Sequence, residues 1–128
     1  MRDRLAPARR FAAGAGSIQM AAGVSLFLDP FGFARTLRWS PEPRTDVGLY
    51  FGRCLGALAI GFGFEGLNAA REPASRTAWF RATEVGAWLL AAVHVRGMLE
   101  GSQPLTEHLE IPVWMAMAAG ARKFAPGR

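Results

Sequence analysis

Residues 49–70, LYFGRCLGALAIGFGFEGLNAA, constrain the fold more than any other part of the chain. As a helix this stretch is about 33 Å long at about 1.5 Å per residue, which is enough to cross a bilayer. Small residues recur four, three and four positions apart and share one helix face, namely Gly52, Gly56, Ala59 and Gly63. Glycines weaken a helix in water, whereas in a membrane small residues let a second helix approach closely. The stretch therefore predicts a helix-packing face in an integral membrane helix bundle.

The chain is 51% hydrophobic, and its apolar residues are gathered into blocks with polar connections between them. Lys and Arg number 15 against 10 Asp and Glu, which gives a net charge of +5. These basic residues separate the apolar blocks instead of forming one face, so we expect topology signals and lipid head-group contacts and no nucleic-acid partner. Cys54 is the single cysteine, which excludes an intrachain disulfide and a cysteine metal site.

Four apolar blocks predict an all-α polytopic membrane protein, a single four-helix transmembrane domain over residues 1–128. The predicted spans are 11–28, 49–70, 77–99 and 105–124. Pro30 ends the first span because proline cannot continue a helix. In the fourth span, Pro112 either kinks the helix or lies in its first turn. The uncharged part of that span is short, which leaves open whether it crosses the membrane completely.

The connection from residue 29 to 48 alternates aromatic and basic side chains. This pattern is typical of a short amphipathic segment that lies at the membrane interface, with Trp39 as an aromatic anchor. A docking surface for a partner protein is the alternative. The candidate docking residues are Phe31, Phe33, Arg35, Arg38 and Trp39.

Orientation follows from the basic residues at the ends of the spans. Four spans place ten of the 15 Lys and Arg on the side of both termini, so we expect both termini in the cytoplasm. Three spans would put the basic C-terminal tail outside, which fits this rule less well.

Ionisable residues within the spans are predicted to lie in two layers. The outer layer holds Arg53, His94, Arg96, Glu107 and Glu110, and the inner layer holds Glu65, Arg81 and Glu84. Because an unpaired charge in lipid is costly, we expect Arg53 to pair with Glu110 or Glu107, and Arg81 with Glu84 or Glu65. The layers are either interhelical clasps or, on the outer side, a polar pocket for a lipid, a quinone head group or a small amphiphile. A proton path is disfavoured because residues 85–93 offer no relay group.

His94 is the one intramembrane histidine in the third span. Such a residue can ligate haem or a chlorophyll-type magnesium, but a hydrogen-bonded packing role is the stronger expectation. No metal site and no resident cofactor are predicted. The chain also has no nucleophile elbow, phosphate-binding glycine loop or zinc-ligand spacing, so an enzyme is not the first expectation.

The chain resembles the DoxX-like group of small four-helix bacterial membrane proteins. The resemblance lies in Asp29-Pro30 after the first span, in YFGRCLGALAIGFG at 50–63, in VRGMLEGSQP at 95–104, and in Glu110 at the start of the last span. It implies a four-helix bundle in the bacterial cytoplasmic membrane. It implies no activity that can be carried over to individual residues.

Two functional hypotheses follow from these features. The first is a non-catalytic accessory or assembly subunit of a larger membrane complex of respiratory or photosynthetic type, surrounded by membrane lipids. It is favoured by the small size, the missing catalytic motifs and the aromatic, basic outer connection. The alternative is a small membrane enzyme or carrier for a lipophilic substrate such as a quinone or a lipid, bound in the outer polar pocket.

Overall fold

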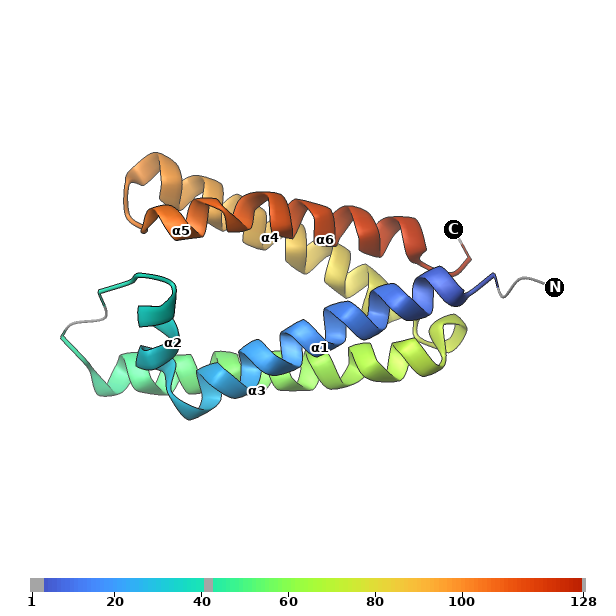
Figure 1. Ribbon diagram of the computed structural model, residues 1–128, viewed down its shortest axis with the longest axis horizontal. Helices are drawn as coiled ribbons and strands as arrows, with labels where there is room; N and C mark the ends of the chain where they lie inside the picture. Colours follow the sequence, from blue (N-terminus) through green and yellow to red (C-terminus); the bar gives the residue numbers. More distant parts are fainter. Residues whose placement is uncertain (1–3, 41–42, 128) are drawn as a thin grey trace.

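The computed structural model describes residues 4–40 and 43–127, and the regular structure within these ranges is helical throughout. In chain order the elements are α1 (Ala6–Leu28), α2 (Pro30–Thr36), α3 (Asp46–Arg71), the 3-10 helix η1 (Pro73–Ser75), α4 (Thr77–Glu100), α5 (Leu105–His108) and α6 (Glu110–Phe124). The long helices form two antiparallel pairs, α1 with α3 and α4 with α6 (Figure 1). The pairs meet at the end where both termini lie and diverge toward α2 and α5 (Figure 1). The predicted all-α class is confirmed.

The connection between α1 and α3 is built by caps that the sequence encodes. Asp29 follows the last residue of α1, and its side chain accepts a hydrogen bond from the Gly32 backbone N–H at 2.9 Å. Pro30 occupies the first position of α2, where its missing N–H costs nothing. Thr45 caps α3 by accepting a hydrogen bond from the Gly48 N–H at 3.0 Å. The predicted interfacial segment therefore holds a seven-residue helix and a turn before the second long helix begins.

The α1–α3 interface is formed by small residues that bring the two backbones into contact. A Cβ atom at Gly63 would lie 2.6 Å from the backbone N of Met20, and one at Gly23 would lie 2.6 Å from the backbone N of Ile60. A Cβ atom at Gly56 would lie 2.5 Å from the backbone N of Phe27. These distances leave no room for a side chain, so the glycines set how closely the helices approach.

All four residues of the predicted packing face lie against α1 or α2. Gly56 and Gly63 contact the α1 backbone, Ala59 lies beside Gly23, and Gly52 faces the ring of Pro30. The glycine spacing in the sequence thus corresponds to the contact surface of α3.

An aromatic core joins the two helix pairs at the end that carries the termini. Phe80 is fully buried and Trp79 nearly so, and the Phe11 ring packs on both at centroid distances of 6.2 and 6.3 Å. The Phe124 ring lies 5.7 Å from Phe11, and the Trp79 indole donates a hydrogen bond to the Phe62 carbonyl at 3.1 Å. The core therefore draws on α1, α3, α4 and α6.

The second helix pair has a sharp turn and a broken return helix. Gly101 ends α4 in the left-handed conformation at φ 62°, and the Ser102 N–H returns to the Gly97 carbonyl at 3.1 Å. The region of the predicted fourth span, 105–124, is divided into two helices, because α5 ends at His108 and α6 begins at Glu110. Pro112 causes this break, since it cannot donate to the carbonyl four residues earlier and its ring crowds that carbonyl. It lies in the first turn of α6, one of the two positions expected for it.

Two helices, α1 and α3, are long and apolar enough to cross a membrane. Only 22% of the apolar window of α1 and 11% of that of α3 are buried within the molecule. Large exposed apolar side chains on α3 include Phe51, Leu55 and Leu58, and those on α4 include Val85 and Leu89. A core helix of a water-soluble protein would be mostly buried, and this surface is therefore of the kind that lipid or another protein covers.

Candidate functional site

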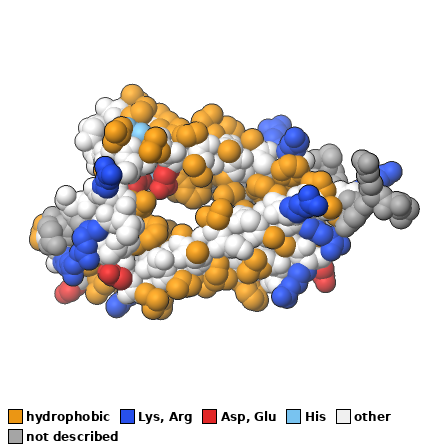
Figure 2. Space-filling model, in the orientation of Figure 1, with side chains coloured by type: hydrophobic (Ala, Val, Ile, Leu, Met, Phe, Trp, Pro, Cys, Tyr) orange, Lys and Arg blue, Asp and Glu red, His pale blue; other side chains and the backbone are white. Residues whose placement is uncertain are grey.

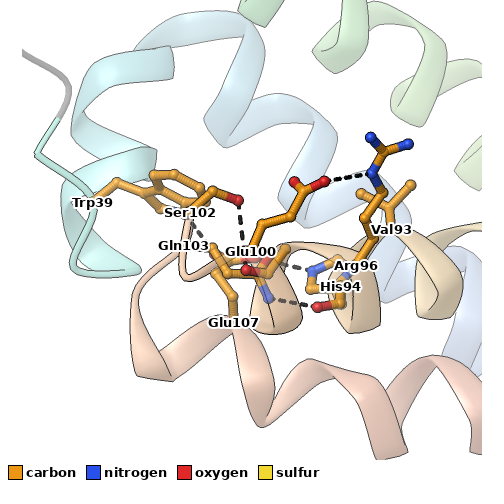
Figure 3. A pocket seen from close by; sticks show the side chains of 9 residues that line it. Trp39, Val93, His94, Arg96, Glu100, Ser102, Gln103 and Glu107 are labelled. Atoms are coloured by element: carbon orange, nitrogen blue, oxygen red, sulfur yellow. Dashed lines mark hydrogen bonds and ion pairs between the residues drawn. The ribbon is translucent and has the colours of Figure 1, made fainter.

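A pocket of about 300 Å³ opens where the two helix pairs diverge. Its walls come from α4, the turn after it, α5 and the segment after α2 (Figure 3). The lining residues are Trp39, Val93, His94, Arg96, Gly97, Glu100, Ser102, Gln103 and Glu107. Most of these side chains are polar, although the helices that carry them are largely apolar on their outer faces.

His94, Glu107 and Glu110 form a cluster beside this pocket, in which His94 and Glu107 are buried and Glu110 is partly exposed. The His94 Nε2 atom lies 2.9 Å from Glu107 Oε2 and 3.4 Å from Glu110 Oε2. The side chains of His94 and Glu107 are only 10% and 9% exposed. Because the residues come from α4, α5 and α6, the Gly101 turn and the break at Leu109 together bring them to one point.

Hydrogen bonds fix the orientation of each member of the cluster. His94 Nδ1 lies 2.7 Å from the Leu90 carbonyl oxygen, which only accepts, so Nδ1 carries the proton. The Trp39 indole donates to Glu107 Oε1 at 2.7 Å. The Trp114 indole donates to Glu110 Oε2 at 3.0 Å. Each of the three side chains therefore has a hydrogen-bond partner outside the cluster, and for Glu110 this partner contacts the same Oε2 atom that faces His94.

The segment after α2 closes the outer wall of the pocket. Arg38 adopts the left-handed conformation at φ 63°, and the Trp39 N–H returns to the Ala34 carbonyl at 3.1 Å. This turn directs the Trp39 indole to Glu107 across a gap of 68 residues in sequence. The Thr106 hydroxyl donates a hydrogen bond to the Leu37 carbonyl beside it. The two helix pairs are thus connected at this end through Trp39 and Thr106.

Gly97 makes room for the floor of the pocket. A Cβ atom there would overlap the Gln103 side chain, which lies flat against α4. In this position the Gln103 amide donates to the His94 carbonyl at 2.8 Å. The turn after α4 is therefore fixed to the same residue that carries the imidazole.

The structure brings together four of the five predicted pocket residues. His94, Glu107 and Glu110 are in direct contact, and Arg96 lies at the pocket edge with its Nε atom 2.8 Å from Glu100. The predicted pairing of Arg53 with Glu107 or Glu110 is wrong. Arg53 is exposed on α3 and makes no ion pair with any residue that the structure describes. His94 takes the position that was expected for an arginine.

The predicted inner pairing of Arg81 is also wrong. Glu65 pairs with Arg76 at 3.0 Å, because the η1 turn brings Arg76 back to the end of α3. Glu84 lies 3.7 Å from Arg122 of α6. Arg81 itself is exposed and has no ion pair within the described ranges.

The candidate docking residues divide into two groups. Arg44 lies over the Phe31 ring at 5.4 Å from its centroid, and Trp39 is engaged with Glu107, so both aromatic side chains make contacts within the chain. Phe33 is half-buried on α2, and Arg35 and Arg38 are exposed. The segment thus contributes to the pocket, a role that the sequence patterns did not indicate.

Sequence reasoning missed Trp39, Ser102, Gln103 and Trp114 as parts of the site. The spacing between Glu110 and Trp114, one helical turn, is the single local signal for any of them. The contact between Trp39 and Glu107 joins distant parts of the chain and has no local signal.

His94, Glu107 and Glu110 are also the described residues whose donor atoms lie close enough to hold a metal ion, within 4.8 Å of one another. The free nitrogen of His94 faces two carboxylates, which differs from the open axial approach that a haem or chlorophyll-type ligand needs. The arrangement can bind a cation or present acceptors and donors to a polar group.

The fold and the site define an all-helical protein with two candidate membrane-spanning helices and a buried histidine–glutamate cluster beside a pocket. Comparison with protein-family models, with curated proteins and with solved structures finds no match for this chain. The resemblance to DoxX-like proteins stays a prediction.

Proposed function

We propose that the protein is a small four-span membrane protein that binds the polar head of a lipophilic molecule, such as a quinone or a lipid, in the pocket beside His94. The observation that carries this proposal is the convergence of His94, Glu107 and Glu110 next to a pocket of about 300 Å³. Ligand sites combine such a cavity with a few fixed polar groups.

The exposed apolar helices support a position in the membrane. α1 and α3 are each about 35–39 Å long at about 1.5 Å per residue, which exceeds the hydrocarbon core of about 30 Å. α4 has a similar length and lies beside α6 in the second pair (Figure 1). α6 is shorter, about 22 Å, so α5 and the break at Leu109 complete the crossing.

The orientation in our proposal is that of a bacterial cytoplasmic membrane with both termini on the cytoplasmic side. Both ends of the chain lie at the same end of the molecule (Figure 1). Basic side chains lie at this end, and a second group lies at the opposite end near α2 and the start of α3 (Figure 2). By sequence, ten of the 15 Lys and Arg lie on the side of the termini, which supports the orientation that we propose, with the pocket in the outer half of the bilayer.

A route for an apolar tail is the second feature that supports the proposal. The space-filling view has a hollow between the two helix pairs, with hydrophobic side chains on both sides and acidic side chains at one end (Figure 2). A molecule with a polar head and a flexible tail matches this distribution. Val93 contributes an apolar wall to the pocket itself. The Gln103 amide donates one N–H to the His94 carbonyl and keeps a second N–H for an oxygen-rich head group, whereas the Ser102 hydroxyl donates to the Gly97 carbonyl at 3.5 Å and can accept from the ligand.

The accessory-subunit hypothesis has no such local support. The apolar surfaces of α3 and α4 suit lipid tails and a partner subunit equally. We therefore give preference to the pocket. Co-migration with a larger complex on a native gel in mild detergent would reverse that preference, whereas a single small species with a bound molecule supports the binding role.

The test is binding of a short-chain quinone and of a phospholipid to the purified full chain in detergent, followed by tryptophan fluorescence. Gln103→Ala removes a pocket donor and is expected to weaken binding at least about tenfold through the lost hydrogen bond and its effect on the turn. Leu58→Ala, which removes a side chain that is 72% exposed on α3, is the matched control for partition into the micelle. Equal affinities of the two variants for both probes would contradict the proposal.

A further inference from the structure

We propose that His94, Glu107 and Glu110 bind one divalent transition-metal ion. Their donor atoms lie within 4.8 Å of one another, and two of the edges of this triangle, 2.9 and 3.4 Å, start at His94 Nε2. Ligands bound at about 2.0–2.2 Å around one metal lie roughly 3–4 Å apart, so small side-chain shifts bring the three donors onto one ion. The inference does not depend on the lipophilic ligand proposed above.

The tautomer of His94 leaves a lone pair on Nε2, the nitrogen that would bind the metal ion. Nδ1–H donates to the Leu90 carbonyl at 2.7 Å, so in the neutral imidazole Nε2 is the free acceptor. This acceptor faces the Glu107 and Glu110 carboxylates, which are acceptors as well. Three acceptors that point at one another require a cation between them, either a proton or a metal ion.

The hydrogen bonds to the cluster match those that commonly orient metal ligands. A metal-binding histidine commonly donates its second N–H to a backbone carbonyl, and ligating carboxylates are in turn hydrogen-bonded. Here the Leu90 carbonyl holds His94, the Trp39 indole holds Glu107 at 2.7 Å, and the Trp114 indole holds Glu110 at 3.0 Å. All three candidate ligands therefore have a fixed orientation, which a mere ion pair does not need.

The local charge favours a divalent ion over a proton. Two carboxylates and a neutral imidazole sum to −2, whereas a proton on Nε2 would leave a net charge of −1 at a largely buried point. The nearby guanidinium of Arg96 does not supply the missing charge, because its Nε atom is paired with Glu100 at 2.8 Å and its side chain is 80% exposed. A divalent ion neutralises the cluster completely.

The donor set selects the kind of metal. One imidazole and two carboxylates suit Mn²⁺, Fe²⁺ and Zn²⁺, while the absence of thiolate in the donor set disfavours Cu⁺. Three protein ligands leave at least one coordination position, and His94 and Glu107 also line the pocket. An ion held here is thus accessible to a molecule in the pocket, as in metal sites with an open position.

The test uses the purified full chain in detergent, with any affinity tag removed and bound metals stripped by a chelator. Titration with Co²⁺ is followed by its visible absorption, and titration with Zn²⁺ by calorimetry. The expected result is one equivalent of either ion per chain. Glu107→Gln and Glu110→Gln keep the size of the side chain and are expected to weaken binding at least about tenfold, because each removes a charged ligand.

Two further variants keep the proposal falsifiable if a ligand variant does not fold. Trp114→Phe leaves all three ligands in place but removes the hydrogen bond that orients Glu110 through its Oε2 atom, and is expected to weaken Co²⁺ binding by about tenfold. His108→Gln removes the neighbouring histidine, which lies outside the donor group, and is expected to bind Co²⁺ like the unmodified chain. Helix content by circular dichroism is recorded for every variant. Binding of less than one equivalent by the unmodified chain, or equal Co²⁺ affinity in the unmodified chain and in Trp114→Phe and any folded ligand variant, overturns the proposal.

Discussion

The interface between α1 and α3 and the region where α4 meets α5 and α6 both join helices, but they do so with different kinds of contact. Between α1 and α3, glycines at 16, 23, 56 and 63 bring two backbones into contact. Around His94, long polar side chains fill the space; hydrogen bonds from other elements fix His94 and Glu107, and Trp114 of the same helix fixes Glu110. The first region is specified by the shape of the backbone and the second by the pairing of donors and acceptors.

The comparison shows which region is available for binding. Close backbone packing leaves no volume for a ligand and no ionisable group at the interface. A polar cluster is stable only when all of its members are satisfied, so it responds strongly to the loss or addition of one partner. The binding role that we propose therefore belongs to the second region, and the first region is the scaffold in that proposal.

The largest effect is expected from a side chain placed between α1 and α3. Gly63→Leu puts atoms where the Met20 backbone lies 2.6 Å from the built Cβ, and we expect a loss of about 3 kcal/mol or more in the free energy of unfolding. Thermal unfolding in detergent, followed by circular dichroism, measures this loss. Gly61→Leu is the control, since nothing lies within 4 Å of that position. Similar unfolding temperatures for the two variants would show that the glycine contact is not what holds this pair together.

A smaller but still large effect is expected from Glu107→Ala. The substitution leaves His94 and the Trp39 indole without their partner in a buried place, which costs about 2–4 kcal/mol. Glu65→Ala breaks a pair with Arg76 whose side chains are more than 40% exposed, and is expected to cost less than about 1 kcal/mol. Chemical unfolding of both variants compares the two. A Glu65 variant as unstable as the Glu107 variant would contradict the claim that the buried pair contributes more to stability than the exposed pair.

Trp39→Phe is expected to loosen the pocket end while leaving the rest of the molecule intact. It removes the indole donor to Glu107, worth about 1.5–3 kcal/mol as a hydrogen bond to a charged group. Faster tryptic cleavage after Arg38 is the measurement, because that bond lies in the segment that Trp39 anchors. Trp88→Phe, on an exposed part of α4, is the matched control and should not change the cleavage rate.

The smallest effect is expected at the turn that presents Trp39. Arg38 holds the left-handed conformation at φ 63°, which glycine adopts freely, so Arg38→Gly should stabilise the protein by up to about 1 kcal/mol. Gly101 holds the same conformation at φ 62°, and Gly101→Ala should destabilise by about 1 kcal/mol. Thermal unfolding distinguishes the two signs. A destabilised Arg38 variant would indicate that the arginine side chain makes a contribution that outweighs its backbone strain.

The helices of the fold could be predicted because their signals are local. Apolar blocks, Pro30 and the glycine spacing on residues 52–63 mark where helices lie and which face of one of them packs. The start of α1 at Ala6 was missed, because Arg9 and Arg10 were assigned to a polar lead and not to the helix. The break at Leu109 was left open, since Pro112 permits both a kink and a new start.

The site could be predicted only as a set of residues at one depth. Counting about 1.5 Å per residue gives the height of a group along a helix but not the direction in which it points. Arg53 follows Gly52 by one residue and is therefore turned about 100° away from it around α3, so its height alone did not place it at the cluster. His94 and Glu110 lie seven and nine positions on either side of Gly101, and this near symmetry about a helical turn was the signal that could have paired them.

Trp39 and Thr106 also determine how firmly the two helix pairs are held together at the end where they diverge. Within the described residues, two hydrogen bonds, from Trp39 to Glu107 and from Thr106 to Leu37, connect the two helix pairs there. Together such bonds are worth about 2–4 kcal/mol, so at equilibrium about one molecule in 30 to one in 1,000 has released both. The aromatic core around Phe80 keeps the opposite end joined in those molecules, and under the binding role that we propose their hollow would exchange its contents without any unfolding of the long helices.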